Sequence, residues 1–243
     1  MRLSAPVFRL KRQARLLARE KEIPLHKALD RIAQDEGFRS WSHLAVSSSG
    51  HRRAGEVLAQ LDPGDLVLLG ARPGQGKTLL GLELAADAVR KGRQSFFFTL
   101  EYTEEDVLSR LGSLGTDVKS LECSFVLDTS DDICADYIIG QLGQAPRGTL
   151  VVVDYLQLLD QKRRNPELAD QVLALKAFAR AAGAIIVLIS QIDRSFDRLA
   201  GAARTGARLP DIANVRLPNP LDLTVFTKTC FLHEGDLVLE AVA

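Results

Sequence analysis

Short apolar runs alternate with helical stretches from Gly55 onward. Runs that read as strands lie at 66–69, 95–100, 124–127, 150–153 and 185–190. Stretches with helical spacing of apolar residues lie between them, at 78–91, 104–113, 131–143 and 167–182. Continuous apolar strands separated by amphipathic helices are typical of a parallel sheet that is covered on both faces. The pattern therefore predicts an α/β fold with a mainly parallel central sheet flanked by helices.

The end of the chain departs from this alternation. Leu223–Phe226 and Leu237–Val242 both read as closing strands. Residues 233–236 separate the last strand from what precedes it and contain a glycine, which favours a hairpin turn there. We therefore expect antiparallel strands to complete the sheet.

The first 45 residues read instead as a separate group of helices. Pro6 suits the start of one helix, and Gly37 suits the end of a second that runs from Leu25 to Glu36. Ser40 is placed to cap a last short helix that carries Trp41 and Leu44. The apolar faces are expected to hold Phe8, Leu10, Ala14, Leu17 and Ala18 in the first helix and Leu25, Ala28, Leu29, Ile32 and Ala33 in the second.

These patterns divide the chain into three parts. We expect a small helical module at 1–46, a polar linker at 47–54 and the α/β domain at 55–243. The aromatic residues Phe38 and Trp41, with Leu44, are expected to form a small core of the module rather than a surface that stacks on bases.

Charge is distributed unevenly along a chain that has no formal net charge over its 243 residues. The first 53 residues carry an excess of about seven positive charges, so the remainder carries an equal negative excess. A basic arm on an acidic body fits contact with nucleic acid, and it also fits an ordinary solvated helical face. Both interpretations stay open at this level.

Cysteine usage and hydropathy exclude several classes of protein. The three cysteines form no C-x-x-C pair and no metal-ligand spacing, as expected in a reducing cytosol. No apolar stretch reaches 18 residues, and the N-terminus has no apolar signal region. We therefore expect a cytoplasmic protein with no membrane partner.

The strongest chemical signal follows the first predicted strand. Residues 71–78 read Ala-Arg-Pro-Gly-Gln-Gly-Lys-Thr and open a helix, which is the context of a phosphate-binding loop. Backbone N–H groups of such a loop and of the helix N-terminus surround phosphate oxygens, and glycine lets the backbone approach them. Ala71 stands where the motif has its first glycine.

This loop predicts ATP and Mg²⁺ as cofactors. Lys77 is expected to reach the β- and γ-phosphates, and Thr78 to offer its hydroxyl to Mg²⁺. The residues expected to bind the nucleotide are Arg72, Pro73, Gly74, Gln75, Gly76, Lys77, Thr78 and Leu79.

Three other predicted strands end in polar residues. Asp154 is expected to hold Mg²⁺, Glu101 to orient and deprotonate the attacking water, and Gln191 to sense the γ-phosphate through a hydrogen bond. Each residue also has an ordinary interpretation as a polar strand end. For Glu101 a second alternative is a helix-capping acid, because residues 103–106 form a strong helix start.

The motifs occur in an order that resembles one family. The strings 71–78, Leu-Glu at 100–101, Val-Asp-Tyr-Leu-Gln-Leu at 153–158 and Ser-Gln-Ile-Asp-Arg at 190–194 are similar to the motor domain of DnaB-type replicative helicases. The resemblance covers about residues 55–243, and the run at 153–158 is its most specific part. It implies a RecA-like P-loop NTPase, with the roles already assigned to Lys77, Thr78, Glu101, Asp154 and Gln191.

The resemblance also implies an assembly. Such motors form rings, usually hexamers, with ATP between subunits and single-stranded DNA in the pore. Loops after Gln191 would face that pore, and basic loops suit a phosphate backbone. The candidate DNA-binding residues in this segment are Arg194, Arg198, Arg204 and Arg208.

One departure from the family concerns its final strands. The family's final strands carry a Lys-x-Arg pair whose arginine reaches the ATP of the neighbouring subunit. The best match here is Lys228-Thr-Cys230, which makes Lys228 a candidate to act in trans and replaces the arginine with Cys230. A second alignment takes 223–226 as the preceding strand and leaves the arginine strand absent. Either alignment predicts weak hydrolysis, because cysteine supplies no fixed positive charge.

Several functions therefore compete. The chain reads first as an ATPase that acts on DNA, and second as a nucleotide-binding regulator or assembly protein that hydrolyses ATP slowly. A third interpretation gives nucleic-acid binding to the basic helices, with the α/β domain as a scaffold. A KaiC-like or recombinase-like ATPase is a further relative to consider. Residues 1–46 do not resemble the N-terminal domain of replicative helicases, and their partner is unknown.

Overall fold

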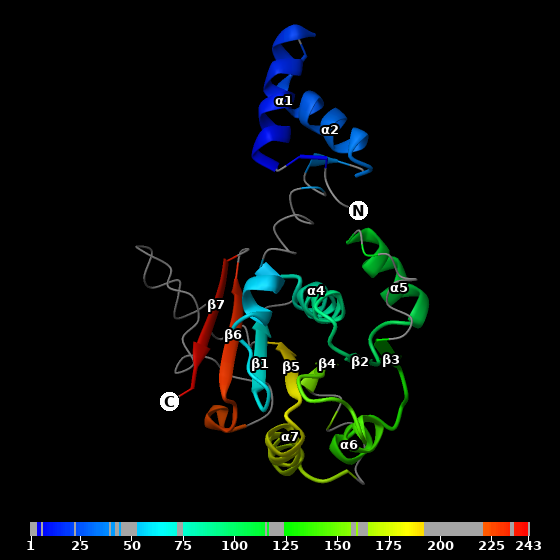
Figure 1. Ribbon diagram of the computed structural model, residues 1–243, viewed down its shortest axis with the longest axis vertical. Helices are drawn as coiled ribbons and strands as arrows, with labels where there is room; N and C mark the ends of the chain where they lie inside the picture. Colours follow the sequence, from blue (N-terminus) through cyan, green and yellow to red (C-terminus); the bar gives the residue numbers. More distant parts are fainter. Residues whose placement is uncertain are drawn as a thin grey trace.

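The computed structural model describes two bodies of the chain. The described residues are 4–5, 7–21, 23–38, 40–41, 44, 53–71, 75–114, 116, 124–156, 159, 165–191, 221–233 and 236–242. Figure 1 shows a pair of helices, α1 and α2, and an α/β body. None of the described helices is long and apolar enough to cross a membrane.

The body is built on a seven-stranded sheet with the order β3-β2-β4-β5-β1-β6-β7. Its strands are β1 (Leu66–Ala71), β2 (Ser95–Thr99), β3 (Phe125–Asp128), β4 (Leu150–Asp154), β5 (Ile185–Gln191), β6 (Lys228–His233) and β7 (Asp236–Ala241). All neighbouring pairs are parallel except β6 and β7, which are antiparallel. The predicted α/β class and the mainly parallel sheet are confirmed, and the sheet closes with an antiparallel pair made of β6 and β7.

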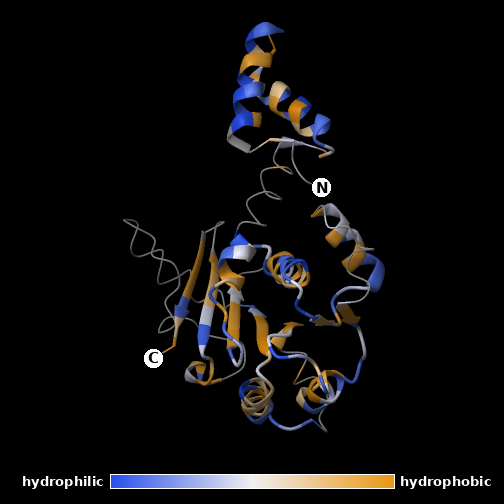
Figure 2. Ribbon diagram, in the orientation of Figure 1, coloured by the Kyte–Doolittle hydropathy of each residue, from blue (hydrophilic) through white to orange (hydrophobic). Residues whose placement is uncertain are grey.

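Helices cover both faces of the sheet. They are α4 (Lys77–Arg90), α5 (Glu104–Ser113), α6 (Ala135–Leu142) and α7 (Leu168–Ala182). Residues of α4 and α5 share one apolar cluster with one set of strand side chains, and residues of α6 and α7 share a second cluster with the alternate set. Figure 1 shows these two layers on opposite sides of the strands. Because both faces are covered, the central strands β1, β2, β4 and β5 are mainly apolar, and Figure 2 shows the middle of the sheet largely in orange.

Gly81 lets α4 lie close to the centre of the sheet. A Cβ atom at this position would stand 2.7 Å from Ile189 Cδ1 and 3.2 Å from Val152 Cγ1. These contacts come from β5 and β4, the two strands at whose ends polar site residues were predicted. The glycine therefore brings the helix that follows the phosphate loop directly against the strands that carry Asp154 and Gln191.

Two predicted elements differ from the structure. The run Leu223–Phe226 is not a strand; Leu223–Val225 forms a 3₁₀ turn, η4, and the Asp222 side chain accepts the Thr224 N–H at 2.9 Å. This cap gives the backbone a local hydrogen-bond partner, so the run packs against α7 without joining the sheet. Helix α6 begins at Ala135 rather than at 131, because Asp128 and Ser130 fold residues 128–132 into turns.

The N-terminal module has a small core of its own. Helices α1 (Val7–Glu20) and α2 (Leu25–Asp35) pack together, and Leu10, Ala33, Phe38 and Leu44 are buried among them. Gly37 ends α2 with a φ of 85°, and Trp41 packs against the same core, as predicted. Leu25 is the exception in the predicted stripe of α2, since it is 43% exposed.

The segment between the module and the body lies outside the described residues from 45 to 52. A helical segment begins at Arg53 and runs to residue 58, and its Ala54 is fully buried against the body. Ala54, which was expected in the linker, therefore packs with the core of the body.

Candidate nucleotide-binding site

The residues predicted at the ends of strands meet at the carboxyl edge of the sheet. Strand pairing places Thr99 beside Asp154 and Gln191 beside Ala71. Strands β2, β4, β5 and β1 are successive neighbours in the sheet, so their carboxyl ends form one continuous row. Ligands of open parallel sheets bind at such an edge.

The phosphate loop leads into α4 through Gly76. This residue precedes the helix with a φ of 86°, a left-handed conformation that glycine adopts without strain. Lys77 is the first residue of α4, Thr78 is 6% exposed, and Leu79 packs against the core. Gln75 is half-buried, while the expected ligands Arg72, Pro73 and Gly74 lie outside the described residues. The start of α4 thus presents its free backbone N–H groups where the motif requires them.

Asp154 is the most unusual acid of the site. It is fully buried at the end of β4, and neither carboxylate oxygen has a well-formed hydrogen bond within the described part of the chain. Its pKa is raised to about 6, mainly by burial and to a smaller extent by the nearby Glu101 carboxylate. The Thr78 hydroxyl and the positive charges of Lys77 and Arg110 lower the pKa of the same group. Asp154 therefore stands within electrostatic reach of the phosphate-loop residues and of Glu101.

The surroundings of Asp154 fit a divalent cation. A buried carboxylate without well-formed hydrogen bonds is costly unless a cation or ordered water satisfies it. The Thr78 hydroxyl adds a second oxygen ligand next to it. Among the described residues, no group of three or more His, Cys, Asp or Glu side chains is placed to hold a metal ion. A carboxylate with a neighbouring hydroxyl suits Mg²⁺, which is usually bound by one or two carboxylates together with phosphates and water.

Glu101 lies immediately after β2 with an exposed side chain. Its N–H donates to the Thr99 hydroxyl at 3.1 Å, which fixes the backbone at the strand end. The alternative role of Glu101 as a helix cap is not adopted, because Thr103 and Asp106 form a reciprocal capping box at the start of α5. The Glu101 carboxylate is therefore left to face the site.

Gln191 ends β5 with an exposed side chain at the same edge. Its pairing with Ala71 places it next to the entrance of the phosphate loop. An amide at this position can donate or accept a hydrogen bond to a group held by the loop.

Arg110 is a member of the site that the sequence patterns did not reveal. It projects from α5, and its guanidinium carbon lies 4.3 Å from the centre of the Tyr102 ring. Tyr102 directly follows Glu101, so the stacked arginine borders the segment that carries the expected base. The separation of Tyr102 and Arg110 along the chain is visible in the sequence. The proximity of Arg110 to the site, however, depends on how α5 packs on α4.

Lys228, the candidate to act in trans, forms ion pairs within its own chain. Its ammonium group donates to Asp62 at 2.8 Å and pairs with Asp65 at 2.7 Å, both in its own chain. Register with Val67 places Lys228 at the amino end of the sheet, away from the phosphate loop. Cys230 is 1% exposed in the core, and burial raises its thiol pKa to about 12, so it is no counterpart of a surface arginine.

The expected DNA-binding arginines fall outside the described residues. This holds for Arg194, Arg198, Arg204 and Arg208, which follow β5. Strand β5 ends at Gln191, and the segment that carries these arginines follows it in the chain.

Comparison with known families matches most of the α/β body. The family described as DnaB-like helicase C terminal domain matches residues 47–134 and 135–213. The replicative DNA helicase DnaB of Pasteurella multocida is 26% identical over 236 residues, which cover 83% of this chain and 50% of that protein. A probable replicative DNA helicase of Trieres chinensis is 27% identical over 187 residues, covering 63% of this chain and 41% of the relative. The chain thus spans half the length of these relatives or less.

Solved structures give the same result for the fold. A DnaB-like replicative helicase, solved in a study of its interactions with primase, superposes with a TM-score of 0.58 at 20% identity and covers 72% of this chain and 48% of that one. A KaiC-like protein of Pyrococcus horikoshii superposes with a TM-score of 0.51 at 17% identity, covering 75% and 83% of the two chains. Likeness at this level of identity shows the RecA-like fold, which confirms the predicted fold class.

Proposed function

Because the chain belongs to the DnaB-like helicase C-terminal domain family, we propose that it is a Mg²⁺-dependent ATPase that acts as a ring on single-stranded DNA. The observation that carries this proposal is that the predicted phosphate-binding, metal-binding and catalytic side chains lie around Asp154. A fully buried carboxylate without a well-formed hydrogen bond lies within electrostatic reach of Lys77, Thr78 and Glu101. A purely structural domain does not need a buried carboxylate next to a lysine, a threonine and a second acid, whereas ATP hydrolysis uses each of these four side chains.

Each side chain then has a separate part in the reaction. Lys77 binds the β- and γ-phosphate oxygens at the start of α4, where the helix N-terminus also favours negative charge. Glu101 accepts a proton from the attacking water, because its carboxylate is exposed at the edge where the γ-phosphate would lie. Gln191 donates a hydrogen bond to the terminal phosphate, which distinguishes ATP from ADP.

Thr78 and Asp154 are the residues that would hold Mg²⁺. The cation, when bound, neutralises charge on the phosphate oxygens. The buried carboxylate of Asp154 contributes by attracting it and by fixing its position relative to Thr78. Arg110 supports the same charge balance, since its positive charge lowers the pKa of Asp154 and its stacking on Tyr102 holds the segment next to Glu101.

A hydrolysis-poor regulator is the second candidate function. The observation that favours it is the position of Lys228, whose ammonium group is engaged within its own chain at the opposite edge of the sheet. In that case the protein uses ATP to set its assembly or its partner, and turns it over slowly. The two candidates differ in turnover but share the same nucleotide site.

Steady-state ATP hydrolysis separates the candidates. It is measured at several protein concentrations, with and without single-stranded DNA, for the parent protein and for Lys77→Ala. DNA-stimulated turnover that rises with concentration and is lost in Lys77→Ala supports the ring ATPase. Tight ATP binding with negligible turnover favours the regulator, and absence of ATP binding overturns both.

The catalytic assignment has its own variant pair. Glu101→Gln is expected to retain nucleotide binding while kcat falls by ~10² or more, because a general base contributes roughly that factor. Glu105→Gln removes an exposed carboxylate of α5 and is expected to change neither value. Equal loss of binding and turnover in Glu101→Gln would contradict the proposed role.

A further inference from the structure

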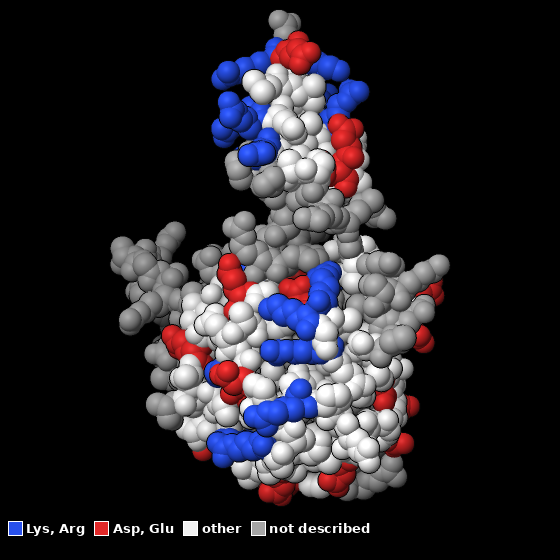
Figure 3. Space-filling view, viewed as in Figure 1, with Lys and Arg blue, Asp and Glu red and all other residues white. Residues whose placement is uncertain are grey.

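The N-terminal module is the part of the molecule that the proposed function leaves unexplained. Its helices precede residue 47, where the family match begins. The module nevertheless folds around its own apolar core and carries many of the Lys and Arg residues of the chain, as Figure 3 shows for the face in view. Because the module is folded, is basic and lies outside the family match, we looked for a binding partner that suits its charge.

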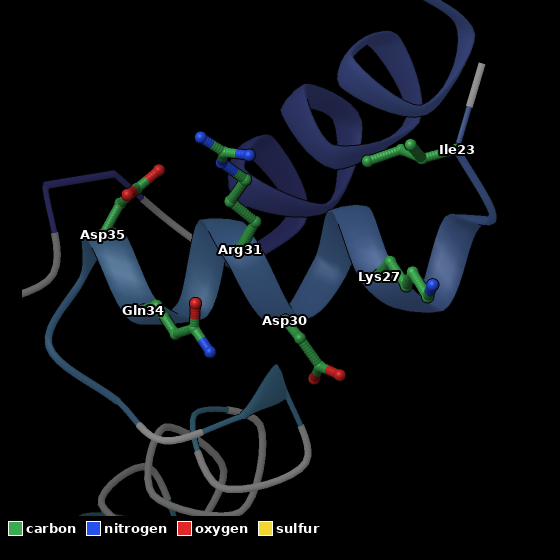
Figure 4. A pocket seen from close by; sticks show the side chains of 6 residues that line it. All are labelled: Ile23, Lys27, Asp30, Arg31, Gln34 and Asp35. Carbon is green, nitrogen blue, oxygen red and sulfur yellow. The ribbon is translucent and has the colours of Figure 1, made fainter. Parts of the chain in front are cut away.

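The positive charge of the module is concentrated on α1. This helix bears Arg9, Lys11, Arg12, Arg15 and Arg19, all exposed, and Glu20 is its one acidic residue. Helix α2 differs, because acidic and basic side chains alternate on it. A depression of about 580 Å³ along α2 is lined by both signs of charge, and Figure 4 shows its side chains fanning out rather than converging. The depression therefore offers no defined site for an anion, and α1 is the charged surface of the module.

The arginines of α1 form a row on the side opposite the core. At ~100° per residue, Arg12, Arg15 and Arg19 lie within about 60° of one another and face away from the buried Leu10 and Ala14. The row spans ~10 Å along the helix axis, from the rise of ~1.5 Å per residue. Lys11 lies on one flank of the row, so the cationic surface is wider than a single line. No acidic side chain pairs with Arg12, Arg15 or Arg19 within the described part of the chain.

We propose that α1 binds the phosphate backbone of a nucleic-acid duplex through Arg12, Arg15 and Arg19. A row of cations ~10 Å long on one face of a straight helix can lie along the phosphates of one strand, because the phosphate charges of a DNA duplex follow one another closely along its axis. Arginine suits this partner because its planar guanidinium donates two parallel hydrogen bonds to a phosphate. Residues 9–20 of α1 include no aromatic side chain that could stack on an unpaired base, which favours a duplex over a single strand.

A membrane surface is the main competitor, and the packing of α1 argues against it. A helix that lies in a membrane interface needs a free apolar face. The apolar face of α1 is buried: Leu10 is 1% exposed and Ala14 is fully buried within the module. Among the described side chains of α1, Leu16 is the one large apolar group that is exposed, at 56%, and it stands beside the arginine row. A single leucine among cations fits a groove better than an acyl layer.

The inference goes beyond the proposed ATPase, because it concerns a different body and a different form of nucleic acid. In a ring, one such module per subunit would hold duplex DNA next to the motor. Binding by α1 requires neither Mg²⁺ nor ATP, so it can be measured with the nucleotide site empty. Failure of the ATPase proposal would leave this measurement unchanged.

The test is duplex binding by the full chain in EDTA without nucleotide. Fluorescence anisotropy of a labelled DNA hairpin of mixed sequence is recorded over a series of salt concentrations. The variant R12Q/R15Q/R19Q is expected to bind at least ~10-fold more weakly, and its slope of log K against log salt is expected to fall by about 2–3, one step for each lost phosphate contact.

A matched control comes from the body. Lys91, Arg147 and Arg180 are exposed at the amino edge of the sheet, and K91Q/R147Q/R180Q removes the same charge. Figure 3 shows Lys and Arg side chains on the body as well as on the module, so this control tests net charge directly. It is expected to keep both the affinity and the salt slope of the parent. An unchanged circular dichroism spectrum shows that the α1 variant is folded.

Several results would overturn the inference. They are absence of duplex binding by the parent chain, equal loss in the two triple variants, or no loss in R12Q/R15Q/R19Q. An α1-dependent preference for single strands overturns the assignment to duplex. Binding to phosphatidylserine vesicles without binding to DNA assigns the surface to a membrane instead.

Discussion

Glu83 is an ionisable residue of α4 that lies in apolar surroundings. It is 3% exposed, and its Oε1 atom has no hydrogen-bond partner within the described residues. Its pKa is raised to about 7, mainly by burial and to a smaller extent by the neighbouring Asp87 carboxylate. The positive charges of Arg53 and Arg90 oppose this shift but do not cancel it. Near neutral pH the folded protein therefore holds a carboxyl group that is only partly ionised.

Neutralising Glu83 is expected to stabilise the protein at high pH. Because the folded pKa lies above the unfolded value of 4.5, this group favours folding at low pH, and that contribution is lost as the pH rises through about 7. Glu83→Gln is thus expected to raise the free energy of unfolding at pH 8 by roughly 1–3 kcal/mol and to change little at pH 5. Thermal unfolding at both pH values measures this.

The control for Glu83 is an exposed acid. Glu104→Gln changes an exposed acid in the first turn of α5. It is expected to lower the midpoint of thermal unfolding slightly, since it removes a favourable negative charge from a helix N-terminus. A gain for Glu83→Gln that is equal at pH 5 and pH 8 would show that packing, not ionisation, is responsible.

Arg110 is expected to affect turnover more than nucleotide affinity. Its guanidinium stacks on Tyr102 and its charge reaches Asp154, so Arg110→Met removes both interactions. We expect kcat to fall by ~10-fold or more with a smaller change in ATP affinity, because preorganised charge acts mainly in the transition state. Arg180→Met, an exposed arginine of α7, is the control. A parallel loss of affinity and kcat would contradict this division.

The sequence predicted some of these residues and missed others for a geometric reason. Lys77, Thr78 and Asp154 follow from local strings, because a strand end followed by a helix fixes where they lie. Lys228 was matched by its order along the chain, which does not tell at which edge of the sheet a residue lies. Arg110 and Glu83 depend on how α4, α5 and the sheet pack, and no local string records that.

At the level of elements, the contact between α4 and the sheet depends on Gly81. A methyl group there would meet Ile189 Cδ1 at 2.7 Å, and real Cβ atoms do not approach so closely. We expect Gly81→Ala to destabilise the fold by roughly 1–3 kcal/mol, since strain from overpacking exceeds the gain in helix propensity of ~1 kcal/mol. Chemical denaturation measures the change.

A second substitution tests the cause of that strain. Ile189→Val removes the Cδ1 atom that the new methyl group would meet, and alone it is expected to cost ~1 kcal/mol. The double variant Gly81→Ala/Ile189→Val is expected to lose less free energy of unfolding than the two single variants together, because valine at 189 removes the clash with the new methyl group. Additive costs would place the strain elsewhere on α4.

Strands β1, β2, β4 and β5 were predictable because each is an apolar run bounded by turn residues. Their order in the sheet was not, since local pattern carries no information on which strands pair. Leu223–Phe226 shows the limit at the level of a single element. It is as apolar as a strand, yet the Asp222 side chain gives its backbone a local partner, and the segment turns before reaching the sheet.

At the scale of the whole molecule, the N-terminal module and the α/β body are expected to unfold separately. The module buries Leu10, Phe38 and Leu44, and the body buries its own residues on both faces of the sheet. A module with so small a core is marginally stable. Differential scanning calorimetry is therefore expected to show two transitions, with the module melting first.

Nucleotide and mutation should act on different transitions. Mg²⁺-ADP binds at the start of α4, so at ~100 times its Kd it adds about 2.7 kcal/mol to the body and raises that transition alone. Leu10→Ala creates a cavity in the module, costs ~2–5 kcal/mol, and is expected to abolish the first transition while leaving the response of the second to nucleotide intact. Leu16→Ala truncates an exposed leucine of the same helix and is expected to leave both transitions in place. One transition that shifts as a unit with both nucleotide and Leu10→Ala would mean that the module and the body fold cooperatively, and duplex binding by α1 would then be coupled to the nucleotide state of the motor.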